Sequence, residues 1–246
     1  MGETAIKALF VYLICSQKLN TETKMLYLKN VTYHPASTPN PILNNINLEL
    51  SSPKLGLVVG PSGSGKSTLL EILAGLAERS SGEIFWQDQS LISDDLQQLA
   101  GLVFQFPERH FCGGTILEEL RLGHPELSSE KVKNALHEVG LDHLSFNTSP
   151  HSLSGGQQRR LALAVQLIRQ PHILLLDEPT AGLDWSMRKQ LVTLLAKLKA
   201  NWSLLIVSHD AGELLPIADF CWTLKQGNLV SVLPQDLTPK EKTLVA

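Results

Sequence analysis

Cysteine is scarce in this chain. Its three cysteines, Cys15, Cys112 and Cys221, stand far apart and form no C-x-x-C pair. This spacing argues against a disulfide framework or a cysteine-based metal site, and we expect three buried thiols in a chain that works in a reducing compartment. The eight histidines show no metal-ligand spacing either.

Long apolar runs and an excess of charge are also missing. No apolar run approaches the roughly 18 residues that a membrane-spanning helix needs. The net charge of −3 and the pI of 6.2 indicate no nucleic-acid surface, so no nucleic-acid partner is expected. Two basic pairs, Arg159-Arg160 and Arg188-Lys189, fall in predicted helices and are expected to form solvated or polar-contact faces.

A glycine-rich segment after the apolar residues Leu57 to Val59 matches the pattern G-x-x-x-x-G-K-[ST]. Its residues are Gly60, Pro61, Ser62, Gly63, Ser64, Gly65, Lys66 and Ser67. Such a loop wraps phosphates with backbone N–H groups, its lysine reaches the β- and γ-phosphates, and its hydroxyl can ligate Mg²⁺. Thr68 and the apolar residues after it predict a helix whose start faces the phosphates.

A second glycine-rich helix start lies at Ser154 to Gly156. Leu161, Val165 and Ile168 then recur at helical spacing, and Pro171 ends the helix. Unpaired N–H groups at such a start attract anions. Considered alone, the same residues fit an ordinary helix capped by Ser154.

A continuous apolar run, Ile173 to Leu176, follows and predicts a strand buried on both faces of a parallel sheet. Asp177 and Glu178 come at its C-terminal end, where open α/β sheets bind ligands. One carboxylate can hold Mg²⁺ while the other orients or deprotonates a water molecule. In isolation, an acidic turn exposed to solvent is the more common explanation for such a pair.

In this order, the motifs resemble those of the ATP-binding subunits of ATP-binding-cassette (ABC) transporters, from about Met25 to Val232. Residues 60–67 resemble the Walker A motif, residues 153–157 the signature motif, and residues 173–177 Walker B. The resemblance implies that Glu178 is the catalytic glutamate, His209 the switch histidine and Gln105 the Q-loop glutamine. It also implies that Tyr33 stacks on adenine and that Asp184 belongs to the D-loop.

The resemblance further implies ATP and Mg²⁺ as cofactors, with Ser67, Gln105 and Asp177 as metal ligands. The glycine-rich loop at residues 60–67, here called the phosphate cradle, would bind ATP from one side together with Thr68 and Tyr33. A second ABC subunit, identical or different, would close over it in a head-to-tail dimer. The residues that would act across this dimer are Ser154, Gly155, Gly156, Gln157 and Asp184. An integral membrane subunit would complete the transporter, and the chain would lie peripherally on the cytoplasmic face.

The expected fold is α/β: a P-loop NTPase of the ABC ATPase type, with a mixed or parallel core sheet and an antiparallel β subdomain. We expect a single ABC ATPase domain over residues 25–246, with a helical subdomain at about 106–160. Residues 1–24 precede the family pattern, and we expect them to be a poorly ordered or surface-docked extension, or not native, with Met25 as the start.

The segments Val103 to Glu108 and Thr115 to Glu119 resemble the energy-coupling-factor, or cobalt-type, importer ATPases and favour import. His110 departs from that subfamily, where many members have glutamine. A soluble non-transport ABC ATPase, such as an iron–sulfur-assembly or scaffold protein, is the alternative. DNA-repair ATPases insert long coiled coils between Walker A and signature, and the short spacing here disfavours them.

Overall fold

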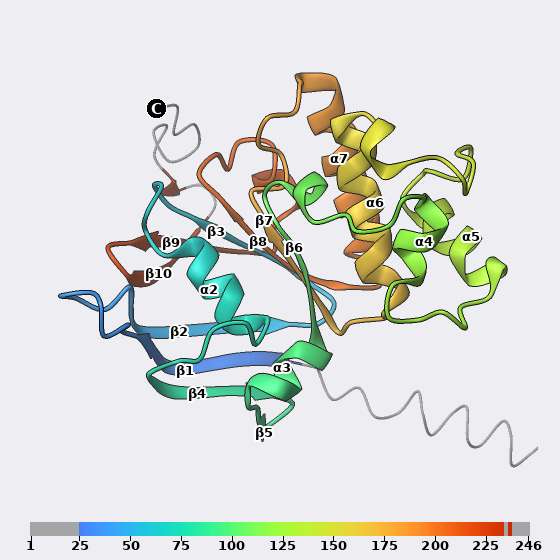
Figure 1. Ribbon diagram of the computed structural model, residues 1–246. Coiled ribbons are helices and arrows are strands. Elements are labelled where there is room, and N and C mark those ends of the chain that lie inside the picture. Colours follow the sequence, from blue (N-terminus) through green and yellow to red (C-terminus); the bar gives the residue numbers. More distant parts are fainter. Residues whose placement is uncertain (1–24, 234–235, 238–246) are drawn as a thin grey trace, which may run out of the picture.

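The structure is a computed structural model that describes residues 25–233 and 236–237 (Figure 1). The expected extension at residues 1–24 therefore lies outside the described residues. The strands are β1 (Met25–Tyr33), β2 (Leu43–Ser51), β3 (Leu55–Val59), β4 (Ser81–Trp86), β5 (Gln89–Ser90), β6 (Ala100–Val103), β7 (Ile173–Asp177), β8 (Ser203–Ser208), β9 (Phe220–Lys225) and β10 (Asn228–Val232). The α-helices are α2 (Lys66–Leu73), α3 (Ser93–Leu99), α4 (Ile116–Arg121), α5 (Ser129–Glu138), α6 (Gly155–Ile168) and α7 (Trp185–Leu198). Short 3₁₀ turns are η1 (Pro107–Arg109), η2 (Pro150–Ser152) and η3 (Leu215–Ile217).

Two sheets form the frame. The larger has six strands in the order β10-β9-β3-β8-β7-β6, and all its neighbours are parallel except β9 and β10, which form a hairpin. The smaller sheet, in the order β2-β1-β4-β5, is antiparallel. This arrangement confirms the predicted α/β fold with a mixed core sheet and an antiparallel β subdomain.

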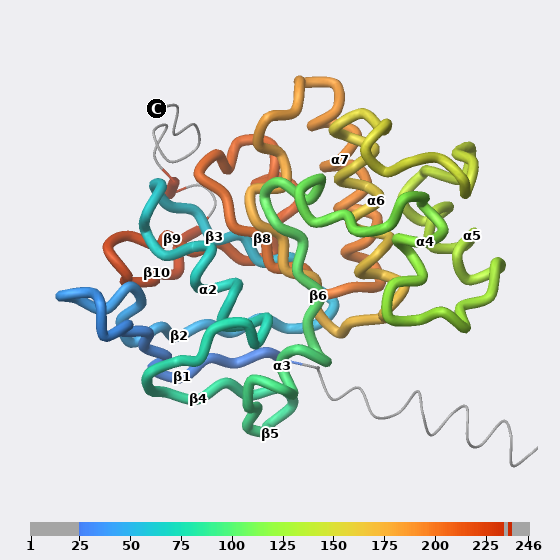
Figure 2. The backbone as a smooth tube through the Cα atoms, viewed as in Figure 1, coloured from blue at the N-terminus to red at the C-terminus, as the bar shows by residue number. Residues whose placement is uncertain are grey.

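The central strands are apolar on both faces because both faces of the large sheet are covered. Leu174 and Leu176 of β7 join a core cluster with α6 and α7, whereas Ile173 and Leu175 join a second cluster with α2, α3 and the antiparallel sheet. Successive strand residues point to opposite faces, so apolar residues are needed at all four positions from Ile173 to Leu176. The cradle helix α2 and the signature helix α6 therefore pack on opposite faces of the sheet (Figures 1 and 2).

The structure corrects several details. Cys221 is buried as expected, but Cys112 is exposed, and Cys15 lies outside the described residues. In helix α6 the buried face differs from the predicted stripe: Leu161 is buried, but Val165 and Ile168 are only half-buried, and Leu163, Ala164 and Leu167 are buried instead.

Candidate functional site

Three segments meet at one edge of the large sheet because its parallel strands end there together. Val59 of β3 is paired with Ser208 of β8, and Asp177 of β7 is paired with Val207 of β8. The residues that follow these strands are the glycine-rich loop, Glu178 and His209. Parallel pairing thus brings together residues that are far apart in the sequence.

The glycine-rich loop connects β3 to α2 and needs its glycines for steric reasons. Gly65 has a φ of 101°, which a residue with a side chain rarely adopts. A Cβ atom on Gly60 would lie 2.2 Å from the carbonyl oxygen of Leu224. Helix α2 begins at Lys66 without a side-chain cap, so its first N–H groups are available to an anion.

Lys66 is the buried cation of this loop. Its Nζ donates hydrogen bonds to the carbonyl oxygens of Gly60, at 2.8 Å, and Pro61, at 3.1 Å. The same atom lies 3.5 Å from Oε1 of Glu178. The structure therefore confines a positive charge to the cradle and pairs it with the carboxylate at the end of β7.

Glu178 lies at the centre of the site. Its Oε2 accepts hydrogen bonds from the Ser208 hydroxyl at 3.0 Å and from the backbone N–H of His209 at 3.1 Å, and it lies 2.8 Å from Nδ1 of His209. The Glu178 side chain is buried, whereas that of His209 is 39% exposed. Ser208 and the His209 N–H therefore hold the buried carboxylate in place, and the partly exposed His209 imidazole lies between this carboxylate and solvent.

Asp177, one residue earlier, is also buried, and its Oδ1 has no hydrogen-bond partner. Burial raises the pKa of Asp177 above its usual range, and a hydrogen bond from Ser67 acts in the opposite direction. A buried, unpartnered carboxylate oxygen beside a hydroxyl is a donor set suited to a hard divalent cation.

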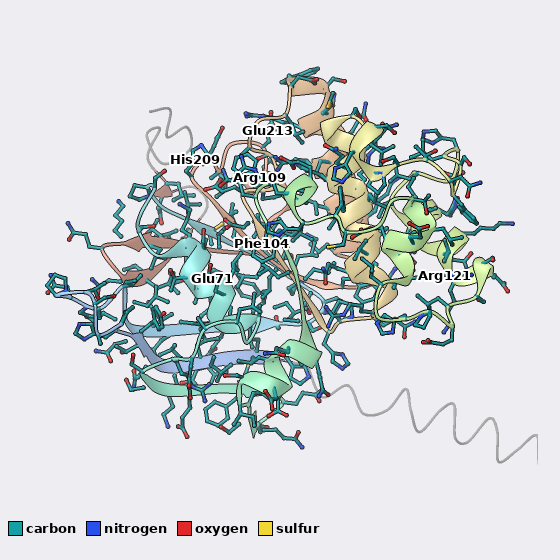
Figure 3. The ribbon with its side chains drawn as sticks, in the orientation of Figure 1. Glu71, Phe104, Arg109, Arg121, His209 and Glu213 are labelled. Atoms are coloured by element: carbon teal, nitrogen blue, oxygen red, sulfur yellow. The ribbon has the colours of Figure 1, made fainter. Side chains whose placement is uncertain are left out.

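Gln105 and Tyr33 come from different sheets: Gln105 follows β6, the last strand of the large sheet, and Tyr33 belongs to β1 of the small sheet. Val103 ends β6 opposite Leu176 of β7, so Gln105 follows the strand by two residues. Figure 3 labels Phe104, next to Gln105, and His209 in the segment after β8. Tyr33 ends β1, and its carbonyl accepts a hydrogen bond from Ile42, whose own carbonyl lies 3.0 Å from a Cβ position on Gly65.

The signature residues do not join this cluster within one chain. The Ser154 hydroxyl caps α6 by accepting from the N–H of Gln157, and the Gln157 side chain accepts from the N–H of Ser154. Gly155 and Gly156 face Leu183 and Met187 at the start of α7. Asp184 caps α7 by accepting from the N–H of Met187 at 2.9 Å.

Sequence reasoning missed two contributors. One is Ser208, whose hydroxyl donates directly to the Glu178 carboxylate. Arg159 was expected on a solvated or polar-contact face, but its side chain is buried and its polar contacts are carbonyls of residues 178–181. For Ser208 the only signal in the sequence is a polar residue at the end of a buried strand. For Arg159 it is an arginine within a helix whose other residues are largely apolar.

Comparisons with known proteins agree with this geometry. The sequence model of the ABC transporter family matches residues 43–181. The chain is 40% identical over 228 residues to the ABC transporter I family member 11, chloroplastic, of Arabidopsis thaliana, covering 86% of this chain and 82% of that protein. It is 38% identical over 220 residues to the energy-coupling factor transporter ATP-binding protein EcfA2 of Streptococcus sanguinis, covering 82% of this chain and 79% of that protein.

The fold is similar to that of solved structures. CbiO1 of Clostridium perfringens, described as part of the ABC transporter complex CbiONQ, superposes with a TM-score of 0.80 at 26% identity. The match covers 90% of this chain and 93% of that one. A family match over more than half of the sequence, with relatives this similar, shows that the chain belongs to the ABC transporter family and is one of its ATP-binding, ATP-hydrolysing subunits.

Proposed function

We propose that this chain binds ATP with Mg²⁺ and hydrolyses it to energise a membrane importer of the energy-coupling-factor type. One observation carries the hydrolytic part: the Glu178 carboxylate lies between the cation of the phosphate cradle and a half-exposed imidazole, 3.5 Å from Lys66 Nζ and 2.8 Å from His209 Nδ1. This arrangement supports the proposal that Glu178 acts as a base beside the terminal phosphate.

Residues 60–68 would bind the phosphates of ATP. Lys66 would leave the carbonyls of Gly60 and Pro61 and turn its ammonium toward the β- and γ-phosphate oxygens. The free N–H groups at the start of α2 would contact the same anion. Tyr33 would supply an aromatic face for adenine, since base stacking needs no hydrogen-bond pattern.

The residues at the end of β7 fit Mg²⁺, because Asp177 offers a carboxylate whose Oδ1 atom is buried without a partner, beside the Ser67 hydroxyl. The Ser67 hydroxyl, Asp177 and the Gln105 amide oxygen would hold the ion. When bound, Mg²⁺ neutralises charge on the β- and γ-phosphate oxygens.

Glu178 would accept a proton from the water molecule that attacks the γ-phosphorus as the bond to the leaving ADP breaks. Ser208 and the His209 N–H hold this carboxylate in place. The exposed imidazole of His209 would contact the γ-phosphate and help to orient the water. The protein would accelerate the reaction mainly by positioning and charge stabilisation.

A second subunit would complete the site. The signature residues lie on the face of the sheet opposite the cradle helix, and they contact α7. Residues 154–157 and Asp184 would therefore act on ATP held by a partner subunit, in a homodimer or a heterodimer.

The membrane partner is inferred from the relatives. EcfA2 is named as the ATP-binding protein of an energy-coupling factor transporter, and CbiO1 is described as part of a transporter complex. Among the described residues, no helix is long and apolar enough to cross a membrane. Other subunits would provide the transport path, with this chain held peripherally at the cytoplasmic face.

Purification of the tagged full chain from its native membranes in mild detergent tests the transport role. An integral membrane protein and an ABC subunit should copurify. Recovery with soluble partners alone would contradict the transport role and leave the ATPase role standing. The ATPase role has its own test: Lys66→Ala should lose ATP binding and turnover, and normal turnover in that variant would refute the assignment of the cradle.

A further inference from the structure

Arg159 is a buried charge in the middle of the signature helix α6. Its side chain is only 7% exposed, although arginine is rarely buried without a partner. Nη1 donates hydrogen bonds to the carbonyl oxygens of Glu178, at 3.0 Å, and Pro179, and Nη2 donates to the carbonyl oxygen of Ala181. One guanidinium therefore joins α6 to the turn that follows β7.

This turn lies between the end of β7 at Asp177 and the start of α7 at Trp185. The N–H of Ala181 donates to the Glu178 carbonyl, and Arg159 adds donors for the carbonyls of Glu178, Pro179 and Ala181. The planar fork of a guanidinium can satisfy several carbonyls at once, which the point charge of lysine cannot do with the same geometry. Burial lowers the pKa of Arg159, and the charge of Glu108, in the 3₁₀ turn η1, acts against that shift.

The backbone of Glu178 is strained where Arg159 holds it. Glu178 has a φ of +45°, in the left-handed region that residues with side chains rarely adopt. Such conformations persist only when surrounding contacts fix them. Here the N–H of Glu178 donates to Val207 at 2.9 Å, and its carbonyl accepts from both Ala181 and Arg159.

We propose that Arg159 is a positioning residue for ATP hydrolysis: it fixes the backbone of residues 178–181 and thereby holds the Glu178 carboxylate against Ser208 and His209. The inference rests on the proposed role of Glu178 as the base. The hydrogen bonds of Arg159 go to backbone carbonyls, so this role requires no contact between its guanidinium and the phosphate or the water. Its removal should therefore lower turnover and leave nucleotide binding in place.

The first test compares Arg159→Met with Arg159→Lys in the full chain with its copurifying subunits. Phosphate release gives kcat and KM, and calorimetry gives the affinity for MgADP. Because a displacement of about 1 Å can cost about 100-fold in rate, Arg159→Met should lower kcat by roughly 30- to 100-fold and change KM and MgADP affinity less than about threefold. Arg159→Lys should recover part of the rate, since an ammonium can still reach a carbonyl.

Arg79→Met is the matched control. Arg79 also donates to two backbone carbonyls, those of Gly82 and Leu91, both at 3.0 Å. These contacts lie between β4 and α3, away from Glu178. Loss of this arginine should leave kcat within about twofold of the wild type, as expected for a substitution outside the site.

A double mutant separates positioning from a general structural role. Residues that act as one unit are not additive, so Arg159→Met should slow Glu178→Gln no further. A further slowing of the double mutant by the full factor, or a loss of MgADP affinity in both Arg159 variants, would overturn the inference. Wild-type turnover in Arg159→Met together with slow Glu178→Gln would also overturn it and leave the role of Glu178 intact. Wild-type turnover in Glu178→Gln would instead refute the proposed base, and the positioning role with it.

Discussion

Replacement of Glu178 by glutamine should separate the binding of ATP from its hydrolysis. The carboxylate pairs with Lys66 through one oxygen and holds Ser208 and His209 through the other. Glutamine keeps the size of the side chain and removes its charge. Lys66 would then be released from a competing partner, while the attacking water would lose its base.

The expected gain in MgATP affinity follows from the loss of the Lys66–Glu178 ion pair. The side chains of Lys66 and Glu178 are 6% and 9% exposed and their charged atoms are 3.5 Å apart. At an effective dielectric constant near 20, this separation corresponds to about 5 kcal/mol of attraction. Desolvation offsets most of that attraction in a buried pair. We therefore expect a net change of about 1.4 kcal/mol, which is about tenfold tighter binding of MgATP.

The loss in rate follows from the missing proton acceptor. General base catalysis contributes about 10²- to 10⁴-fold, which corresponds to about 3 to 5 kcal/mol of barrier. Phosphate release measures the rate, and calorimetry with MgATP measures the affinity of the slow variant. Glu83→Gln is the control, because Glu83 forms an exposed ion pair with Lys29 at 3.6 Å and should change neither quantity. Unchanged affinity together with wild-type turnover would refute the reasoning about Glu178.

Three further predictions concern the metal, the core and a buried thiol. Ser67→Ala should raise the Mg²⁺ concentration needed for half-maximal turnover by about 10-fold or more and leave metal-free nucleotide binding unchanged, because one oxygen ligand is lost; an unaltered Mg²⁺ titration would exclude Ser67 as a ligand. Leu205→Ala should lower the free energy of unfolding in urea by about 2 to 5 kcal/mol, since Leu205 is fully buried in the core cluster that contains α2 and the antiparallel sheet; a loss below about 1 kcal/mol would contradict dense packing there. Burial raises the pKa of Cys221 from 9.0 to about 11, so the folded state favours the neutral thiol, and about 2 to 3 kcal/mol of stability present below pH 9 should be lost as the pH rises to about 11. Urea titrations across this window should show that loss in the wild type and not in Cys221→Ala, and parallel curves would contradict it.

Much of the frame could be predicted because its signals are local. The apolar run of β7 followed by two acidic residues indicated a buried parallel strand with a site at its end. The strand–loop–helix around residues 60–67 was predicted from its glycines and its lysine. Both patterns reflect short-range requirements: burial on two faces, and a backbone that can approach phosphate.

The remaining features depend on tertiary contacts that leave little trace in the sequence. The parallel pairing of β9 with β3, for example, joins segments that are far apart in the sequence and that no turn connects. Arg159 looked like half of a solvated basic pair, because its three carbonyl partners lie beyond the end of its own helix. The exposure of Cys112 likewise depends on how the loop before α4 packs, and the presence of a cysteine in the sequence does not predict that packing.

The parallel arrangement at the site edge also governs when the protein becomes able to bind its nucleotide during synthesis. The glycine-rich loop follows β3, one of the earliest strands, whereas Ser208 ends β8, near the end of the described chain. Strand β3 has no partner in the large sheet until β8 and β9 have been made. Pairings between distant segments close late. A nascent chain released before β8 should therefore expose its phosphate loop without retaining ATP. Retention of nucleotide should then indicate that the large sheet has formed.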